Sequence, residues 1–342
     1  MIKLKLVLDK VIIIIMQESL EGYGKYTLDE FEFESGRVLE NAGVEYLLAG
    51  TPKYDDEGNI INAIVFCHGF HGNYSTINSF HETAKKRNIF DKKDYFFISI
   101  TTLGFPESCS PSSTGLKHDF PEYSIKDRVN FKRKFLKEKL NIQNVFGVIG
   151  YGIGGFESYT WACEYPDEME FIIVFTSSFK TNGYRYVLSK AYESIIESSD
   201  DFYDGGYSES LSRILVAINK MVYSNYFSKR IFQGMSNDEI DVLMDDFVDK
   251  GLFMDIYDFK FRNDAALKYD VEDKLNDIKA KALIITPSDD LYFSPIYDTL
   301  PLKNLIKDSK IIIIESKKHY MDEDDYFAAE NDVRLFLKQF EK

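Results

Sequence analysis

A glycine-rich segment near the middle of the chain carries the clearest chemical signal. Residues 145–149 are mostly apolar, and residues 150–155 read Gly-Tyr-Gly-Ile-Gly-Gly. A buried strand that runs into such a turn and then into a helix is the setting of the nucleophile elbow, G-x-S-x-G, with Gly150 and Gly154 as its outer glycines. The middle position, which holds a nucleophilic serine in that motif, is Gly152. Glycine has no hydroxyl, so a covalent acyl intermediate is excluded at this position.

A glycine-rich turn between a strand and a helix could instead hold a phosphate group. Residues 150–155 do not match G-x-G-x-x-G in register, and no Lys-Ser or Lys-Thr pair follows them as in a P-loop. The sequence therefore favours the elbow over a nucleotide site, and we expect no cofactor.

Two polar segments follow later apolar runs in the order that an elbow site requires. They are Ser-Asp-Asp-Leu (288–291) and Lys-His-Tyr (318–320). In triads built around such an elbow the chain order is nucleophile, acid, histidine. We therefore predict Asp289 as the acid and His319 as the general base. Asp290 stays open as the acid, because adjacent carboxylates on a loop cannot be ranked without geometry.

An upstream apolar run ends in the turn His-Gly-Phe-His-Gly (68–72). A glycine-rich turn at this place supplies one backbone N–H of an oxyanion hole, and the residue after the elbow supplies the other. The two donors would be the amides of Phe70 and Ile153. We expect His71 and Tyr151, their neighbours in sequence, to contact the substrate.

Cysteine and histidine residues near these turns offer alternative chemistry. Cys67, His68 and His71 have a zinc-like spacing, but no distant fourth ligand is evident, so we expect no metal. The two histidines fit a structural role that orients the backbone amides of the turn. Cys109 remains an alternative nucleophile, although a free cysteine is usually inert unless it is exposed and electropositive.

The elements that would position these residues are short apolar runs separated by longer amphipathic stretches. Such runs are typical of strands buried on both faces of a parallel sheet, and their alternation with helical segments predicts βαβ units. The runs are 63–67, 95–100, 145–149, 171–175, 282–286 and 310–314, preceded by a hairpin at 31–33 and 44–48 and interleaved with helices such as 125–140 and 154–165.

The stretch 180–281 lacks such runs and has the pattern of helices at 184–197, 208–223, 237–250 and 256–269. Because strands resume after it, we interpret it as a helical cap inserted into one sheet, over the edge where open α/β sheets bind ligands. The expected organisation is therefore an N-terminal extension (1–30), a core (31–179 and 282–342) and this cap (180–281).

Composition limits the partners. The 342 residues carry 41 Lys and Arg against 56 Asp and Glu, a formal charge of −15, which disfavours nucleic acid and anionic membranes. Three cysteines without paired spacing suit a reducing cytoplasm.

Residues 1–16 are mostly apolar, but Asp9 and Lys10 interrupt them, so the apolar run is too short for a membrane helix. We interpret them as an extra strand or an upstream extension, with a secretion signal as the weaker alternative and Met16 as an alternative start.

At these motifs the chain resembles the homoserine O-acetyltransferase family of α/β-hydrolase-fold proteins, from about residue 35 to the C-terminus. The matching segments are 35–39, 68–72, 110–113, 119–121, the elbow, 165–167, 288–291 and His319. The resemblance implies an α/β-hydrolase fold, a mostly parallel sheet flanked by helices with an inserted helical cap. It also implies acyl transfer from acetyl-CoA and a homodimer that packs through the caps. It places the acid on Asp289, the base on His319, the oxyanion donors on Phe70 and Ile153, and the nucleophile position on Gly152.

Three functional hypotheses follow. The first is an enzyme in which His319 and Asp289 activate water or a substrate hydroxyl directly, with an acyl-CoA or an ester as its small-molecule substrate; hydrolysis, acyl transfer and lyase-type chemistry all fit. The second is a catalytically inactive member of the fold that binds a small molecule or a protein. The third is a Ser-to-Gly mutant of an active enzyme. A pure binding protein needs neither the acid nor the histidine, so the sequence favours the enzyme.

Overall fold

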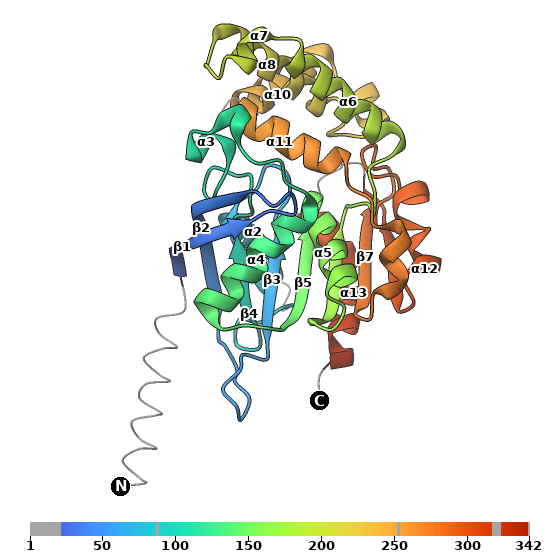
Figure 1. The fold of residues 1–342 in the computed structure, drawn as a ribbon. Coiled ribbons are helices and arrows are strands. Elements are labelled where there is room, and N and C mark those ends of the chain that lie inside the picture. The colour runs from blue at the N-terminus through green and yellow to red at the C-terminus, as the bar shows by residue number, and fades with distance from the viewer. Residues whose placement is uncertain (1–21, 87–88, 252–253, 317–322, 341–342) are drawn as a thin grey trace.

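The centre of the molecule is a mostly parallel β-sheet (Figure 1). The computed structural model describes residues 22–86, 89–251, 254–316 and 323–340. Within these ranges the sheet has eight strands in the order β1-β2-β4-β3-β5-β6-β7-β8. Strand β2 pairs antiparallel with β1 and β4, and the remaining neighbours pair parallel. The strands are β1 (Gly22–Glu32), β2 (Val38–Gly50), β3 (Ala63–Cys67), β4 (Phe96–Ile100), β5 (Val145–Tyr151), β6 (Met169–Phe175), β7 (Lys281–Pro287) and β8 (Ser309–Ile314).

The central strands are buried on both faces, as their apolar sequences predict. Neighbouring residues belong to different hydrophobic clusters: Val65 and Val148 pack with helices α4 and α5, whereas Ile64 and Ile149 pack with α2 and α13. Because side chains alternate along a strand, a slip of one residue would exchange the two faces, so this pattern specifies the register.

The N-terminal hairpin is longer than the sequence indicated. Residues 22–30, which we expected in an extension, form most of β1 and pair with β2. Strand β1 lies at the edge of the sheet and exposes about every second side chain. Its exposed positions hold polar residues, so it lacks the continuous apolar run by which the other strands were predicted. Residues 1–21, including the apolar segment 1–16, lie outside the described residues.

Helices cover both faces of the sheet (Figure 1). The core helices are α2 (Ile77–Lys86), α3 (Pro111–Thr114), α4 (Ile125–Leu140), α5 (Ile153–Glu164), α12 (Leu302–Leu305) and α13 (Glu323–Leu337), with shorter turns η1 (Tyr74–Thr76), η2 (Lys117–Asp119), η3 (Glu272–Asp277), η4 (Pro295–Thr299) and η5 (Lys338–Phe340). The described helices include none that is both long and apolar enough to cross a bilayer.

A group of helices between β6 and β7 lies over one end of the sheet (Figure 1). They are α6 (Gly183–Glu197), α7 (Asp200–Tyr203), α8 (Glu209–Tyr223), α9 (Lys229–Gly234), α10 (Asn237–Gly251) and α11 (Ile256–Leu267). The apolar faces of α6, α7, α8 and α11 form a cluster of their own, which also contacts Phe70 and Tyr292 of the core. We call this group the cap; the boundaries at residues 180 and 281 stay a prediction.

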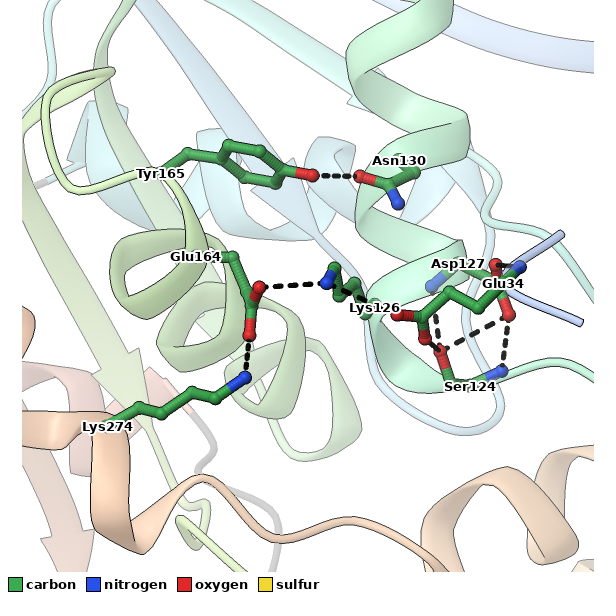
Figure 2. Close-up of polar contacts among 8 residues, drawn as sticks. All are labelled: Glu34, Ser124, Lys126, Asp127, Asn130, Glu164, Tyr165 and Lys274. Carbon is green, nitrogen blue, oxygen red and sulfur yellow. Dashed lines mark hydrogen bonds and ion pairs between the residues drawn. The ribbon is translucent and has the colours of Figure 1, made fainter. Parts of the chain in front are cut away.

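Polar contacts hold the far end of α5, the helix that follows the elbow (Figure 2). The carboxylate of Glu164 forms ion pairs with Lys126 of α4, at 2.9 Å, and with Lys274 of η3. Next to it, the Tyr165 hydroxyl donates to Asn130 Oδ1 at 2.6 Å. Exposed pairs of this kind contribute about 1 kcal/mol or less each. Their effect is to fix the direction of α5 relative to α4.

A buried ionic cluster joins the same two helices in the interior. Arg128 and Lys132 of α4 both contact the carboxylate of Glu157 of α5, with Arg128 Nη2 2.7 Å from Glu157 Oε1. All three side chains are fully buried. Removing one partner of such a cluster costs about 3–5 kcal/mol, because an uncompensated charge remains. The cluster therefore specifies how α5 docks beside α4.

Candidate active site

The elbow geometry is present at Gly152, between β5 and α5. Gly152 has φ +56° and ψ −120°, a conformation that L side chains rarely adopt. Among the described residues, a Cβ at Gly152 would meet only Gly69 Cα, at 4.0 Å, whereas a Cβ at Gly154 would lie 2.0 Å from the Cys67 carbonyl oxygen. The outer glycine is thus required by the close approach of helix and strand. The described residues leave room for a side chain at position 152, and its backbone angle is the restriction that they show.

The turn after β3 is held by His68. Its Nδ1 lies 2.9 Å from the Gly69 carbonyl oxygen, and its Nε2 accepts a hydrogen bond from the Thr102 amide at 3.2 Å. Because a carbonyl oxygen accepts and an amide donates, we assign the proton of the neutral ring to Nδ1. Complete burial lowers the pKa of His68 well below its ordinary value, so the ring is neutral. With both nitrogens engaged by backbone groups, His68 cannot ligate zinc, and the described residues contain no cluster of three or more metal-binding side chains.

The two residues that carry the predicted oxyanion donors line one cavity. The amides of Phe70 and Ile153 have no acceptor among the described residues, and Ile153 is the first residue of α5, where helix N–H groups lack intrahelical partners. A cavity of about 50 Å³ is lined by both residues and by Gly152. The predicted substrate contacts, His71 and Tyr151, line it too. We call Gly69, Phe70, Gly152 and Ile153 the floor of this cavity.

Of the two candidate acids, Asp290 is the one that turns inward. It is 5% exposed and accepts hydrogen bonds from the amides of Tyr292 and Phe293, at 2.7 and 3.0 Å. The side chain of Asp289 is 40% exposed and lies 3.4 Å from Arg230 of the cap. The burial therefore favours Asp290, the alternative that the sequence left open, over Asp289. The predicted base, His319, lies outside the described residues.

The cysteines are not placed to act as nucleophiles. Cys109 is buried, and burial raises the pKa of its thiol to about 12. The same cause raises the pKa values of Cys67 and Cys163 to about 12. Since the thiolate is the nucleophile, a substitute role for Cys109 is disfavoured.

Sequence reasoning missed the polar residues that the cap contributes. Arg185 of α6 is 6% exposed and lines the cavity. Its guanidinium carbon lies 4.7–5.0 Å from the ring centres of Phe156, Tyr292 and Phe293. Nε is 3.5 Å from Thr181 Oγ1, and the terminal nitrogens have no acceptor among the described residues. Local sequence holds no motif for this residue, only its place near the start of the first cap helix.

Two further buried polar atoms at this cavity lack partners within the described chain. They are Oδ1 of Asn225 and the hydroxyl of Tyr192. We call Arg185, Tyr192 and Asn225 the roof of the cavity. Arg185 and Asn225 also line an adjoining cavity of about 620 Å³, which includes Asp290 and Asp298.

Comparison with known proteins gives consistent matches over most of the chain. The model of the alpha/beta hydrolase fold family matches residues 62–326. A probable acyltransferase from Methanothermobacter thermautotrophicus is 39% identical over 302 residues, which are 88% of this chain and 92% of that protein. A homoserine O-acetyltransferase from Sulfurimonas autotrophica is 26% identical over 212 residues, 57% of this chain and 56% of that protein. The solved structure of an acetylester hydrolase from Corynebacterium glutamicum superposes with a TM-score of 0.78 at 21% identity, covering 92% of this chain and 96% of that one, which shows a shared fold.

Proposed function

The chain belongs to the alpha/beta hydrolase fold family, and from this membership we propose that it transfers an acyl group from a small-molecule ester or acyl-CoA to a hydroxyl group or to water, without an acyl-serine intermediate. The observation that carries the proposal is that Phe70 and Ile153, whose amides have no acceptor among the described residues, line one cavity together with Gly152. Amides arranged in this way stabilise the negative charge that develops on a carbonyl oxygen.

The proposed reaction has one addition and one elimination. His319 takes the proton of the acceptor hydroxyl or water while its oxygen forms a bond to the acyl carbon, and the carbonyl electron pair moves to the oxygen between the two amides. The C–O or C–S bond to the leaving group then breaks, and the leaving group takes the proton from His319. We assign Asp290, in place of Asp289, to orient His319, because Asp290 is the buried carboxylate.

The roof supports a substrate that carries an anionic group. The Arg185 guanidinium is buried, and its terminal nitrogens have no acceptor within the described part of the chain. Such a group can bind a carboxylate through two parallel hydrogen bonds. The inner cavity of about 50 Å³ suits a short acyl group, and the outer cavity of about 620 Å³ offers room for the rest of the donor or acceptor.

The cytoplasmic location and the homodimer through the caps remain part of this proposal, and size-exclusion chromatography tests the dimer.

A second candidate is a binding protein that has lost catalysis, and Gly152 itself favours it. The two candidates are separated by Gly152→Ser, with Gly152→Ala as the matched control that adds a Cβ at the same backbone angle but no hydroxyl. We expect a fluorophosphonate probe to label only the serine variant, as measured by intact mass, and its hydrolysis of p-nitrophenyl acetate to exceed that of the alanine variant at least about 100-fold, since a catalytic serine contributes about 10⁶ in kcat.

The unmodified chain supplies the direct test of the non-covalent reaction. We expect slow hydrolysis of p-nitrophenyl acetate above the buffer rate, which His319→Ala removes. If the serine variant is not labelled and His319→Ala changes nothing, the acyl-transfer proposal fails and the binding protein takes its place.

A further inference from the structure

A buried arginine of the cap contacts the turn that carries one oxyanion donor. Arg262 lies on α11 and is 2% exposed. Its Nη1 donates to the Phe70 carbonyl oxygen at 2.9 Å, across 192 residues of sequence. The contact joins the cap to the floor of the cavity, one peptide group away from the Phe70 amide.

Other contacts leave Arg262 little freedom. Its Nε donates to the Asp258 carbonyl oxygen at 3.0 Å, and its guanidinium carbon lies 4.2 Å from the ring centre of Phe105 and 5.2 Å from that of Phe70. The Asp258 carboxylate in turn accepts from the amide and hydroxyl of Ser112, at 2.9 and 2.6 Å. This part of α11 is therefore fastened to α3, and Arg262 is held against Phe70.

The peptide groups before and after Phe70 are both held through their carbonyl oxygens. The carbonyl oxygen of the Gly69–Phe70 peptide, whose N–H is the oxyanion donor, is bonded by His68 and by the Gly72 amide. The carbonyl oxygen of the next peptide is bonded by Arg262. Because a peptide group is planar, fixing both carbonyls restricts the two dihedral angles of Phe70 and therefore the direction of its N–H.

We propose that Arg262 is a positioning residue of the oxyanion hole, and that through it the hole is fully aligned only when the cap is docked. The proposal rests on the acyl-transfer function above, because it gives a role to the Phe70 amide that only this function needs. Arg262 acts through the Phe70 carbonyl and does not itself touch the substrate.

The test measures the alignment of the oxyanion hole separately from the stability of the cap. In the Gly152→Ser background, the phosphonyl oxygen of a fluorophosphonate must occupy the oxyanion hole for labelling to proceed. We expect Arg262→Met to lower the limiting rate of labelling about 10- to 100-fold, somewhat less than the loss of a whole donor, while the half-saturating probe concentration changes less than about threefold. Arg262→Lys, which keeps a donor and a charge, should restore part of the rate.

The matched control is Arg213→Met, which removes an exposed arginine of the cap that pairs with Glu209 and should leave the labelling rate unchanged. The inference is overturned if Arg262→Met leaves the limiting rate of labelling unchanged and lowers only the melting temperature or the affinity for the probe. Arg262 would then stabilise the docked cap without aligning the oxyanion hole. If Arg262→Met does not fold, a rate in Arg262→Lys equal to that of the parent has the same meaning. If Gly152→Ser itself is not labelled, the proposed function fails first, and this inference fails with it.

Discussion

The floor and the roof of the central cavity are built by different means. The floor consists of backbone groups at the ends of β3 and β5, where the spacing of strand and helix leaves no room for a Cβ at Gly154. The roof consists of the cap side chains Arg185, Tyr192 and Asn225. The terminal nitrogens of Arg185, the hydroxyl of Tyr192 and Oδ1 of Asn225 lack partners among the described residues. Backbone groups that are held in place can align the reacting atoms for the chemical step. Polar side-chain atoms without partners can form hydrogen bonds with a substrate and so select it. The difference separates reaction from selectivity within one cavity.

The largest effect should come from a steric clash at Gly154, the residue that follows the floor residue Ile153. Gly154→Ala places a Cβ 2.0 Å from the Cys67 carbonyl oxygen and 2.7 Å from that of His68, so backbone must shift. We expect a loss of about 3 kcal/mol or more in the free energy of unfolding, measured by urea denaturation. Gly234→Ala, where a Cβ meets nothing within 4 Å, is the control and should change stability by less than about 1 kcal/mol. Equal effects of the two substitutions would refute the close packing of helix and strand at Gly154.

A smaller effect should appear beside the roof, at Asp298. Burial raises its pKa from 3.8 to about 6, although Ser178 donates to it and Arg185 opposes the rise. Between these two pKa values the Asp298 carboxyl keeps its proton in the folded state and loses it in the unfolded state. The stability that the protonated Asp298 contributes is therefore complete below about pH 4 and is lost as the pH rises through about 6. Relative to the parent chain, Asp298→Asn should gain up to about 3 kcal/mol in unfolding free energy between pH 4 and pH 7. A difference between the two that is independent of pH would contradict the raised pKa.

The smallest effect, and the one that sharpens the comparison, concerns selectivity. Arg185→Gln should raise KM about tenfold for an ester with a free carboxylate, equivalent to about 1.4 kcal/mol, and leave KM for p-nitrophenyl acetate and kcat for both nearly unchanged. Arg185→Lys, which keeps the charge but not the planar pair of donors, should fall between. The measurement is steady-state kinetics in the Gly152→Ser background. An equal change for charged and neutral esters would mean that Arg185 supports the fold and not the substrate.

Local patterns predicted much of the floor. Continuous apolar runs predicted the central strands, and the glycines at 150 and 154 predicted the elbow, because both depend on residues adjacent in sequence. The nearness of Phe70 and Ile153 followed from two strands ending at the same edge, and the pairing of Cys67 with Gly150 in β3 and β5 agrees with it. Strand β1 was missed in part, because an edge strand exposes polar side chains and lacks an apolar run.

The sequence by itself therefore determined the central strands of the sheet, the elbow without its serine and the order of the candidate acid and base. Only the tertiary structure decided that Asp290 and not Asp289 is buried, that Arg185 lines the cavity, and that Arg262 reaches Phe70. The physical reason is the range of the interactions. Strand and turn conformations depend on neighbouring residues along the chain, whereas the inward side of a loop and the docking of a helical insertion depend on contacts between segments that are far apart in sequence.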